Sequence, residues 1–227
     1  MTVIEIGCMV VKPGLDIMDP SKPEGRVLPG VWNTVTTSPG GPSRVCWGLE
    51  SEDPSRVWAF FDWDSVKQHQ DFAKTLGPDA VKDIPTICVS SDFVKHAALE
   101  PSTDALTALW VEVTLAYFTA DISQADKEVA LAQMERVLAA SGIDNRALGW
   151  GVENDFPLRG GDGQTGAVQT GAVLMGVVGW LSREEQAKFR ETDAYRDSVE
   201  LLERTPGLIG SLKLSIEGKH IEREIKG

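Results

Sequence analysis

The sequence contains one stretch twice: Cys46-Trp47-Gly48-Leu49-Glu50-Ser51-Glu52-Asp53-Pro54 recurs, in altered form, as Gly149-Trp150-Gly151-Val152-Glu153-Asn154-Asp155-Phe156-Pro157. Residues 57–72 are likewise similar to residues 174–189. Such self-similarity identifies the structural unit that repeats. A unit of roughly 105 to 120 residues is a domain rather than one turn of a solenoid. The chain is therefore predicted to form two similar domains, residues 1–100 and 106–227.

Charge and hydropathy exclude several classes of partner. The 227 residues include 22 basic and 34 acidic side chains, a net charge of -12, without a Lys/Arg stripe. Binding to a phosphate backbone depends on clustered positive charge, so we expect no nucleic-acid partner. Apolar runs stay shorter than the roughly 18 residues that a membrane span needs. The first residues also lack the positive region of a signal peptide. We therefore expect a soluble, cytoplasmic protein.

Each copy follows the order strand, helix, strand, strand, helix, strand. In the first copy we expect strands at 3–11, 44–50, 56–63 and 86–95, with helical segments at 31–35 and 65–76. In the second, strands are expected at 109–118, 147–153, 172–180 and 208–216, with helices at 123–140 and 182–202. Residues 100–105 form the predicted linker.

The two copies differ in length between their second and third strands. Trp47 and Trp150 are offset by 103 positions, whereas Trp63 and Trp180 are offset by 117. Fourteen residues have therefore entered the second copy, including a glycine-rich stretch at 159–166. Such a composition predicts a mobile loop. It lacks the GK[ST] ending of a phosphate-binding P-loop.

Both copies begin their second helix with the same signal. Ser65 is followed three residues later by Gln68, and Ser182 by Glu185. This spacing is a capping box, in which the serine and the later side chain bond to free backbone N–H groups. We predict that each serine caps the helix that follows it.

The βαββαβ order is the ferredoxin-like arrangement, an antiparallel sheet with both helices on one face. The third strand, Val57-Trp58-Ala59-Phe60-Phe61, is apolar on both faces, which predicts that the second face is buried too. Two such sheets in one chain could bury these faces against each other. The predicted fold is α+β: two tandem ferredoxin-like repeats that form an intrachain dimeric α-β barrel.

At this point the chain resembles the dimeric α-β barrel superfamily, specifically the antibiotic-biosynthesis-monooxygenase-like (ABM-like) proteins with fused tandem repeats that occur in fungi. The resemblance rests on Trp63-Asp64-Ser65 followed by His69 and Phe72, echoed by Trp180-Leu181-Ser182 with Gln186 and Phe189. It spans roughly residues 2–217. It implies that the fused chain supplies both halves of a barrel that single-repeat members form by dimerising.

Differences between the copies indicate where one of them could be specialised. With the offset of 117, Asp62 corresponds to Gly179, Trp58 to Met175 and His69 to Gln186. His69 lies three and four residues from Val66, Phe72 and Ala73, so it faces the sheet and could line a cavity. An imidazole can serve as a general base near neutral pH. The alternative is a core histidine bonded to a backbone carbonyl.

A carboxylate in the first strand is the second candidate for proton transfer. Glu5, like Glu112 in the other copy, lies within an apolar run. Burial there would raise its pKa and let it carry a proton. The alternative is a glutamate that reaches solvent or pairs with a Lys or Arg. Candidate substrate-binding residues are the aromatic side chains and one carboxylate around the strand-helix junction: Trp47, Trp58, Asp62, Trp63 and Phe72. Tryptophans shared by both copies, such as Trp47 and Trp63, can equally be core residues.

The sequence gives little sign of metals or organic cofactors. Cys8, Cys46 and Cys88 lie in apolar contexts without CxxC spacing, which predicts buried free thiols. His96 and His220 follow lysines near the ends of the copies and are expected to be solvated. The sequence lacks clustered metal-ligand spacing, Rossmann glycines and a nucleophile elbow. We therefore expect no metal, and catalysis without a tightly bound organic cofactor.

The resemblance implies an enzyme of secondary, polyketide-like metabolism that acts on an aromatic or polyene small molecule by oxygenation, cyclisation or isomerisation. His69 would be the general base and Glu5 a second proton carrier. Haem binding or degradation is an alternative, although Glu5 and Gly7 stand where haem-degrading relatives carry an asparagine. Chlorite-dismutase-like relatives take their axial histidine from the second copy, which here has only His220. A non-catalytic carrier or assembly protein is the third reading, because fold alone does not determine function. Whether the chain forms a homodimer stays open.

Overall fold

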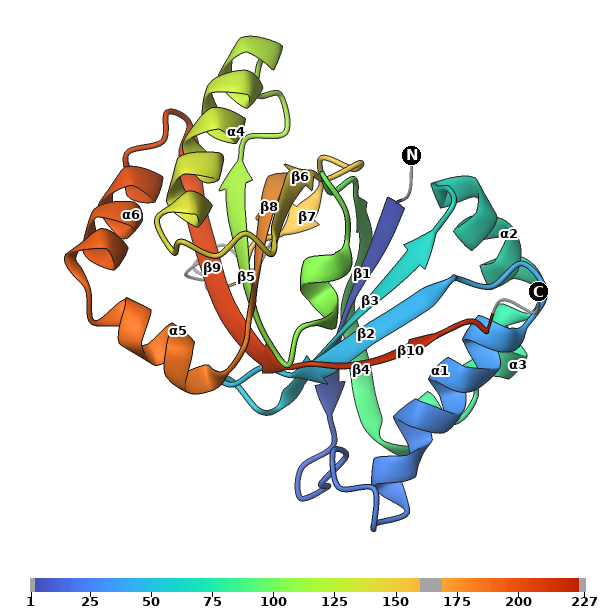
Figure 1. The fold of residues 1–227 in the computed structure, drawn as a ribbon. Coiled ribbons are helices and arrows are strands. Elements are labelled where there is room, and N and C mark those ends of the chain that lie inside the picture. Colours follow the sequence, from blue (N-terminus) through green and yellow to red (C-terminus); the bar gives the residue numbers. More distant parts are fainter. Residues whose placement is uncertain (1–2, 160–168, 225–227) are drawn as a thin grey trace. The chain divides into compact units, whose positions relative to one another are not determined.

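The computed structural model describes residues 3–159 and 169–224. The chain divides into two compact units, which we call unit 1 (Met1–His96 and Ile216–Gly227) and unit 2 (Ala97–Ser215). Each contains an antiparallel five-stranded sheet with helices (Figure 1), which confirms the predicted α+β class. The glycine-rich loop predicted at 159–166 lies, apart from Arg159, outside the described residues.

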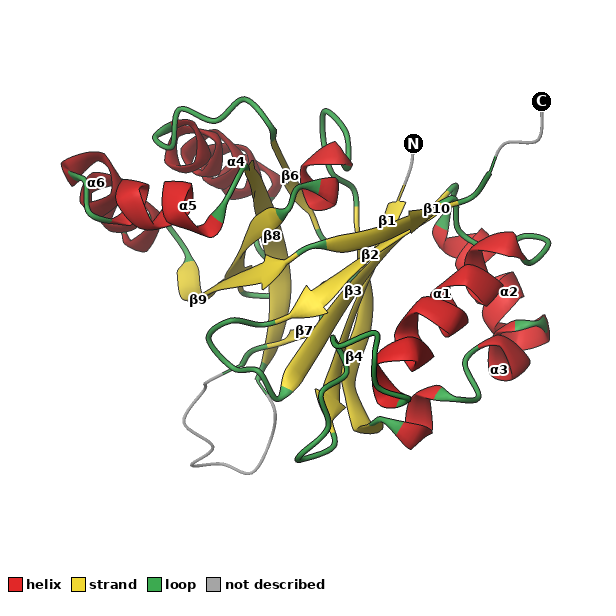
Figure 2. Cartoon of the chain, turned by 60° about the horizontal axis from the view of Figure 1, so that its bottom comes forward, coloured by secondary structure: helices red, strands yellow, loops and turns green. Residues whose placement is uncertain are grey.

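Unit 1 has the sheet order β10-β2-β3-β1-β4. Its strands are β1 (Val3–Val11), β2 (Arg44–Leu49), β3 (Arg56–Trp63), β4 (Cys88–Ala97) and β10 (Lys219–Glu222). Its helices are α1 (Val27–Thr37), α2 (Val66–Thr75) and the single turn α3 (Gly77–Ala80), with 3-10 turns at Glu24–Arg26 and Ile84–Thr86. Figure 2 shows the three helices on one side of this sheet.

Helix α1 is longer than the segment predicted at 31–35. Leu28, Val31, Trp32 and Val35 are all buried, at the i, i+3, i+4, i+7 spacing of an amphipathic helix. Together with the facing residues of β1, β2 and β3 they form the hydrophobic core of unit 1. This spacing lies inside a stretch rich in proline and glycine, which obscured the helix in the sequence.

The register of β1 against β3 decides which side chains face the helices. Glu5 pairs with Phe61 and Gly7 with Ala59. Because side chains alternate along a strand, Glu5, Gly7 and Met9 share the helix-facing side with Ala59 and Phe61. The residues between them, including Ile4, Ile6 and Trp58, point to the opposite side and are also buried.

Unit 2 repeats the arrangement with the order β6-β8-β5-β9, and β7 pairs with β8. Its strands are β5 (Trp110–Phe118), β6 (Arg146–Trp150), β7 (Phe156–Pro157), β8 (Thr170–Trp180) and β9 (Leu208–Glu217). Its helices are α4 (Gln124–Ala139), α5 (Arg183–Arg190) and α6 (Asp193–Glu203), with a 3-10 turn at Asp104–Thr107. The single helix predicted at 182–202 is thus two, because the Thr192 side chain accepts a bond from the Tyr195 N–H and begins a new helix.

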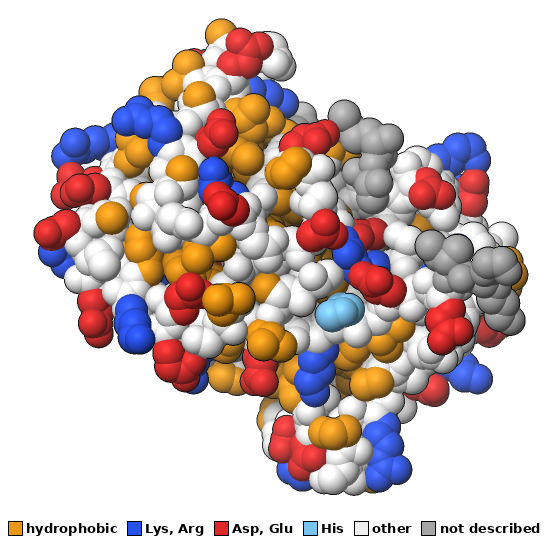
Figure 3. Space-filling view, in the orientation of Figure 1, with side chains coloured by type: hydrophobic (Ala, Val, Ile, Leu, Met, Phe, Trp, Pro, Cys, Tyr) orange, Lys and Arg blue, Asp and Glu red, His pale blue; other side chains and the backbone are white. Residues whose placement is uncertain are grey.

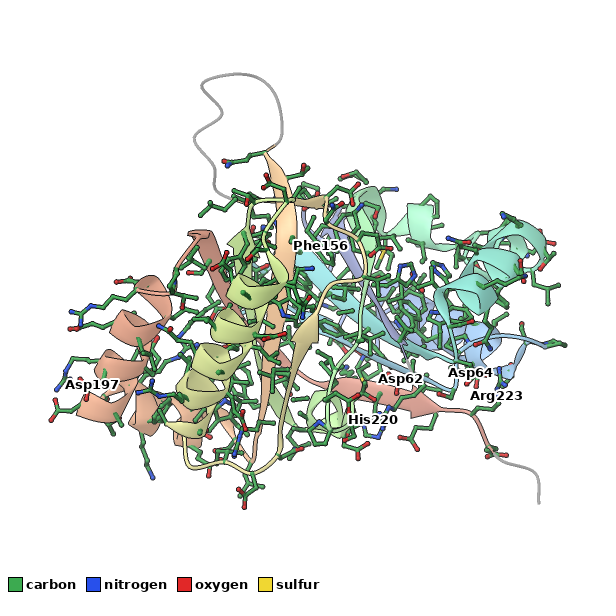
Figure 4. The ribbon with its side chains drawn as sticks, turned by 90° about the horizontal axis from the view of Figure 1, so that it is seen from above. Asp62, Asp64, Phe156, Asp197, His220 and Arg223 are labelled. Atoms are coloured by element: carbon green, nitrogen blue, oxygen red, sulfur yellow. The ribbon has the colours of Figure 1, made fainter. Side chains whose placement is uncertain are left out.

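The end of the chain belongs to unit 1, although the sequence placed residues up to 227 in the second repeat. Strand β10 pairs with β2, with His220 opposite Cys46. Arg223, labelled with His220 and Asp62 in Figure 4, donates to the Thr36 carbonyl oxygen at 2.8 Å and to the Gly41 carbonyl oxygen at 2.6 Å. A four-residue strand that completes a distant sheet leaves no periodic signal long enough to recognise.

On the face shown in Figure 3, Lys and Arg side chains lie interspersed with Asp and Glu. Within the described residues, the helices are all too short or too polar to traverse a lipid bilayer.

Candidate functional site

The start of α2 is set by the predicted cap. The Ser65 hydroxyl accepts a bond from the Gln68 N–H at 3.1 Å, and the Gln68 side chain accepts one from the Asp64 N–H at 2.7 Å. The cap orients the first turns of the helix, so His69 and Phe72 face the sheet. Unit 2 begins α5 in the same way, with Ser182 accepting from the Glu185 N–H at 3.2 Å.

Between the sheet and the helices of unit 1 lies a cavity of about 340 Å³. Its lining is mostly apolar and aromatic. The lining residues are Glu5, Gly7, Met9, Trp32, Val35, Ala59, Phe61, Trp63, His69, Phe72, Ala73, Gly77, Pro78, Val81, Ile84, Ser91 and Val94. A concave, apolar space with few convergent polar groups is the usual form of a small-molecule site.

The titratable groups of this lining lie together in one corner. Glu5 Oε2 is 3.4 Å from His69 Nε2 and accepts a hydrogen bond from the Trp63 indole N–H at 2.8 Å. The Trp63 ring also packs against the imidazole of His69, with ring centroids 5.0 Å apart, and against Phe72 at 5.5 Å. A carboxyl group and an imidazole therefore meet at the wall of an apolar space.

Burial changes the acidity of Glu5. Only 8% of the residue is exposed. Desolvation by burial raises the pKa of Glu5 from 4.5 to about 7, against the opposing effects of the Trp63 hydrogen bond and of the charge on His96. A carboxyl group with a pKa near 7 exchanges its proton readily at neutral pH, as a general acid or base requires.

His96 is not solvated, contrary to the sequence-based expectation. It lies in β4, is 5% exposed, and its Nε2 is 2.8 Å from Nδ1 of His69. The two imidazole rings have centroids 5.0 Å apart. Because β4 is an edge strand next to β1, it brings His96 back beside Glu5 and His69, a contact that spans 27 positions between the histidines. His220 is exposed, as expected.

Four of the seven predicted site residues therefore come together at the cavity: Glu5, Trp63, His69 and Phe72. The other three lie elsewhere. Trp58 is on the opposite face of the sheet, where its indole N–H donates to Glu50 at 2.8 Å. Its strand neighbour Trp63 is five residues away, so the two rings point to opposite faces.

Asp62 and Trp47 have structural roles in unit 1. Asp62, on the same face as Trp58, forms an ion pair with Arg44 at 2.8 Å, and both side chains are largely buried. Trp47 faces the helices but lies within the hydrophobic core of unit 1, 3% exposed. Proximity in the sequence to the strand-helix junction did not reveal which side of the sheet each side chain takes.

Two residues of the corner or its surroundings were missed by the sequence analysis. Trp32 of α1 lines the cavity, and its ring meets Phe61 edge to face at 5.0 Å. The apolar spacing of α1 could have indicated it. His96 could have been found only from the pairing of β4, because its sequence neighbours Lys95 and Ala97 suggest a solvated strand end.

Unit 2 has a different arrangement at the corresponding place. Gln186 stands where unit 1 has His69; it is 2% exposed and accepts a bond from the Trp110 indole at 2.7 Å. The Gln186 amide donates to Glu112 and, at 3.0 Å, to Ser215. Arg190 also contacts Glu112, at 3.0 Å. The space left beside Glu112 is about 10 Å³, room for at most one water molecule.

The described residues do not fit haem. An axial ligand needs an imidazole nitrogen directed at the iron. His69 directs Nδ1 to His96 and Nε2 to Glu5. The described lining of the cavity also lacks a Lys or Arg to meet the haem propionates. Within residues 3–159 and 169–224, His, Cys, Asp and Glu side chains do not gather in groups of three or more that could hold a metal ion.

Neither a protein-family model nor a curated protein matches this sequence. Solved structures are similar over the whole chain. An anthrone oxidase-like protein matches with a TM-score of 0.64 and 10% identity, covering 99% of this chain and 94% of that one. A candidate monooxygenase from Fusobacterium nucleatum has a TM-score of 0.61 at 10% identity, covering 98% and 94%. A candidate chlorite dismutase has a TM-score of 0.56 at 11% identity, covering 98% and 95%.

Identities this low establish the fold and leave the activity open. The chain has the α+β, dimeric α-β barrel fold of monooxygenase-like and chlorite dismutase-like structures, as the tandem repeat predicted.

Proposed function

We propose that unit 1 binds a flat aromatic or polyene small molecule in its cavity and removes a proton from it. The observation that carries the proposal is the Glu5 carboxyl group, with a pKa of about 7, at the wall of an apolar cavity of about 340 Å³. An apolar cavity desolvates the substrate and the base together, so that the proton transfer needs little solvent reorganisation.

We assign the role of general base to Glu5 rather than to His69. Both ring nitrogens of His69 face protein groups, His96 and Glu5. The Glu5 carboxyl has two oxygens, and the Trp63 and His69 contacts engage Oε2. Oε1 is then the oxygen that accepts the substrate proton. His69, whose Nε2 lies 3.4 Å from Oε2, would stabilise the charge of the carboxylate from the side.

The rings of Trp32, Phe61, Trp63 and Phe72 line the same cavity and would hold a planar substrate against the carboxyl group. An acidic C–H conjugated with a carbonyl suits this chemistry, because its removal gives a carbanion delocalised onto the carbonyl oxygen. With an anthrone, the carbanion can react with molecular oxygen, and anthrone plus O₂ yields anthraquinone plus water. Oxygenation of this kind needs no bound organic cofactor; cyclisation or isomerisation would begin with the same proton transfer.

The similarity to an anthrone oxidase-like protein supports this choice of substrate class. The wider setting is part of the proposal: an ABM-like protein of the fused tandem kind found in fungi, cytoplasmic, acting in secondary, polyketide-like metabolism. Its partner would be a small molecule rather than nucleic acid or a membrane. Homodimer formation is a separate question that size measurement in solution would answer.

Anthrone under air is the test substrate, with anthraquinone formation followed by absorbance. We expect Glu5→Gln to lower turnover by about 10²-fold to 10⁴-fold, the usual contribution of a general base. In the wild type the rate should rise with pH through about 7, because the ionised carboxylate is the active form. Glu112→Gln, the matched change in unit 2, should leave turnover unchanged.

Two outcomes would contradict the proposal. Equal turnover by wild type and Glu5→Gln would remove Glu5 as the base. Saturable binding of anthrone in the cavity without turnover by the wild type would favour the non-catalytic reading, a small-molecule carrier.

A further inference from the structure

The contact between His69 and His96 is not used by the proposed proton transfer and calls for a reason. His69 Nδ1 and His96 Nε2 lie 2.8 Å apart and share one hydrogen, so one ring donates and the other accepts. Which ring donates decides where His69 carries its own proton, because a neutral imidazole has a single N–H.

The environment of the pair favours one arrangement. His69 Nε2 lies 3.4 Å from Glu5 Oε2, and an ionised carboxylate accepts hydrogen bonds and donates none. With the proton of His69 on Nε2, its Nδ1 has a lone pair and must accept. His96 Nε2–H is then the donor to Nδ1. The opposite tautomer of His69 would direct a lone pair at the carboxylate.

Unit 2 shows what happens without an imidazole at this position. The Gln186 amide donates to Glu112 through its NH₂ group and needs no tautomer to be chosen. Its partner from β9 is Ser215, a hydroxyl that can donate or accept. In unit 1, His69 and His96 take the places of Gln186 and Ser215. Of these two histidines only His96 is fully buried, with 5% of the residue exposed.

We propose that His96 is a positioning residue: its Nε2–H bond to His69 holds the His69 proton on Nε2, so that His69 donates to Glu5 and favours the ionised form of that carboxyl at the cavity wall. The role rests on the proposed function of Glu5. A group that hydrogen-bonds the ring nitrogen directed away from a site fixes the tautomer and the orientation of the histidine. His96 itself need not touch the substrate.

The test compares two variants of equal side-chain length, His96→Gln and His96→Met. The glutamine amide can donate to His69 Nδ1, whereas methionine has no such donor. Imidazole ¹⁵N shifts at pH 8.5 report the tautomer of His69 without any substrate. We expect the wild type and His96→Gln to carry the proton on Nε2, and His96→Met to show a mixture of tautomers. His220→Gln, an exposed histidine of the same unit, is the control.

With anthrone as the probe, His96→Met should lower kcat on the order of tenfold, within the range of acid-base effects. His96→Gln should restore most of the loss, and KM should stay similar in all variants. A His69 that keeps Nε2–H in His96→Met, with kcat equal to that of His96→Gln, would overturn the proposal and leave His96 as a packing residue. If the wild type does not turn over anthrone, the proposed function fails on that probe, while the tautomer measurement still decides the role of His96.

Discussion

Units 1 and 2 share a scaffold and differ in what fills the space between sheet and helices. Both place a glutamate in the first strand of the repeat, Glu5 and Glu112. In unit 1 the glutamate borders a cavity of about 340 Å³, and in unit 2 the space is about 10 Å³. Three positions around the glutamate differ between the units: His69 corresponds to Gln186, Ala73 to Arg190, and Gly7 to Thr114.

The comparison shows two ways to satisfy a buried carboxylate. In unit 2 Glu112 has a guanidinium and an amide as partners, which compensate its desolvation. Unit 1 leaves Glu5 with an indole and an imidazole, and its pKa rises to about 7. A compensated carboxylate is a structural group, whereas a poorly compensated one next to a cavity is suited to proton transfer.

The largest expected effect is on the free energy of unfolding at pH 8, which should rise in Glu5→Gln and fall in Glu112→Gln. The folded-state pKa of Glu5 is raised from 4.5 to about 7, so the folded protein keeps a proton that the unfolded chain has released. Stability therefore falls as pH rises from 4.5 to 7 and stays lower above 7. Glu5→Gln removes this loss and should be more stable than the wild type at pH 8, by up to about 3 kcal/mol.

Glu112→Gln should instead destabilise the protein at pH 8, because Arg190 loses its buried anionic partner. Urea unfolding at pH 4.5 and pH 8 measures both variants, since the midpoint and slope give the free energy of unfolding. If Glu5→Gln has the same stability relative to wild type at both pH values, the assigned pKa of Glu5 is wrong.

The next contrast concerns the residues behind the glutamates. Gln186→Ala should cost about 2–3 kcal/mol, because the Trp110 indole and Glu112 would lose buried hydrogen bonds. His69→Ala should shift the melting temperature by only a few degrees, yet lower anthrone turnover about 10²-fold. Thermal unfolding and turnover measured on both variants distinguish a structural role of the side chain from a role in proton transfer. A large loss of stability with unchanged turnover in His69→Ala would identify a core histidine.

A smaller effect is expected from narrowing the cavity. Gly7→Thr copies residue Thr114 of unit 2, and a Cβ at Gly7 would meet only the Ala59 carbonyl oxygen, at 3.8 Å. The side chain should therefore fit the fold while occupying cavity volume. We expect anthrone binding, followed by quenching of tryptophan fluorescence, to weaken roughly tenfold, an amount typical of one or two lost apolar contacts. Unchanged affinity would place the ligand elsewhere.

The smallest expected effect is the loss of stability on removing a helix cap, and it should be equal in the two units. Ser65→Ala and Ser182→Ala each remove a helix cap, at a cost of about 1 kcal/mol each. Turnover should fall only for Ser65→Ala, and only slightly, because that helix carries His69. Chemical denaturation of both variants tests the equality; a twofold larger cost in one unit would show that the caps are not equivalent.

The sequence predicted four strands of each repeat and the helices α2 and α4 closely, since apolar periodicity and caps are local signals. Residues 56–63 were expected as a strand and form β3, and the cap at Ser65 is present. The helix α1, the break at Thr192 and the strand β10 were misjudged or missed. The break at Thr192 depends on a single capping bond and β10 on four residues, which a window of apolar residues does not resolve. The apolar spacing of α1 was obscured by the prolines and glycines around it.

Part of the candidate site was also predictable. His69 and Glu5 stood out because one differs between the copies and the other is a charge within an apolar run. Trp58 and Asp62 were misplaced, because their side of the sheet follows from the β1 and β3 register.

By itself, the sequence determined the repeat, the α+β class and the residue types available for proton transfer, because these depend on local pattern and composition. Only the tertiary structure decided that His96 meets His69, that Trp58 points away, and that, among the described residues, a cavity of about 340 Å³ lies beside Glu5. Those features depend on strand pairing and on the sum of many side-chain volumes, which residues distant in the sequence contribute together.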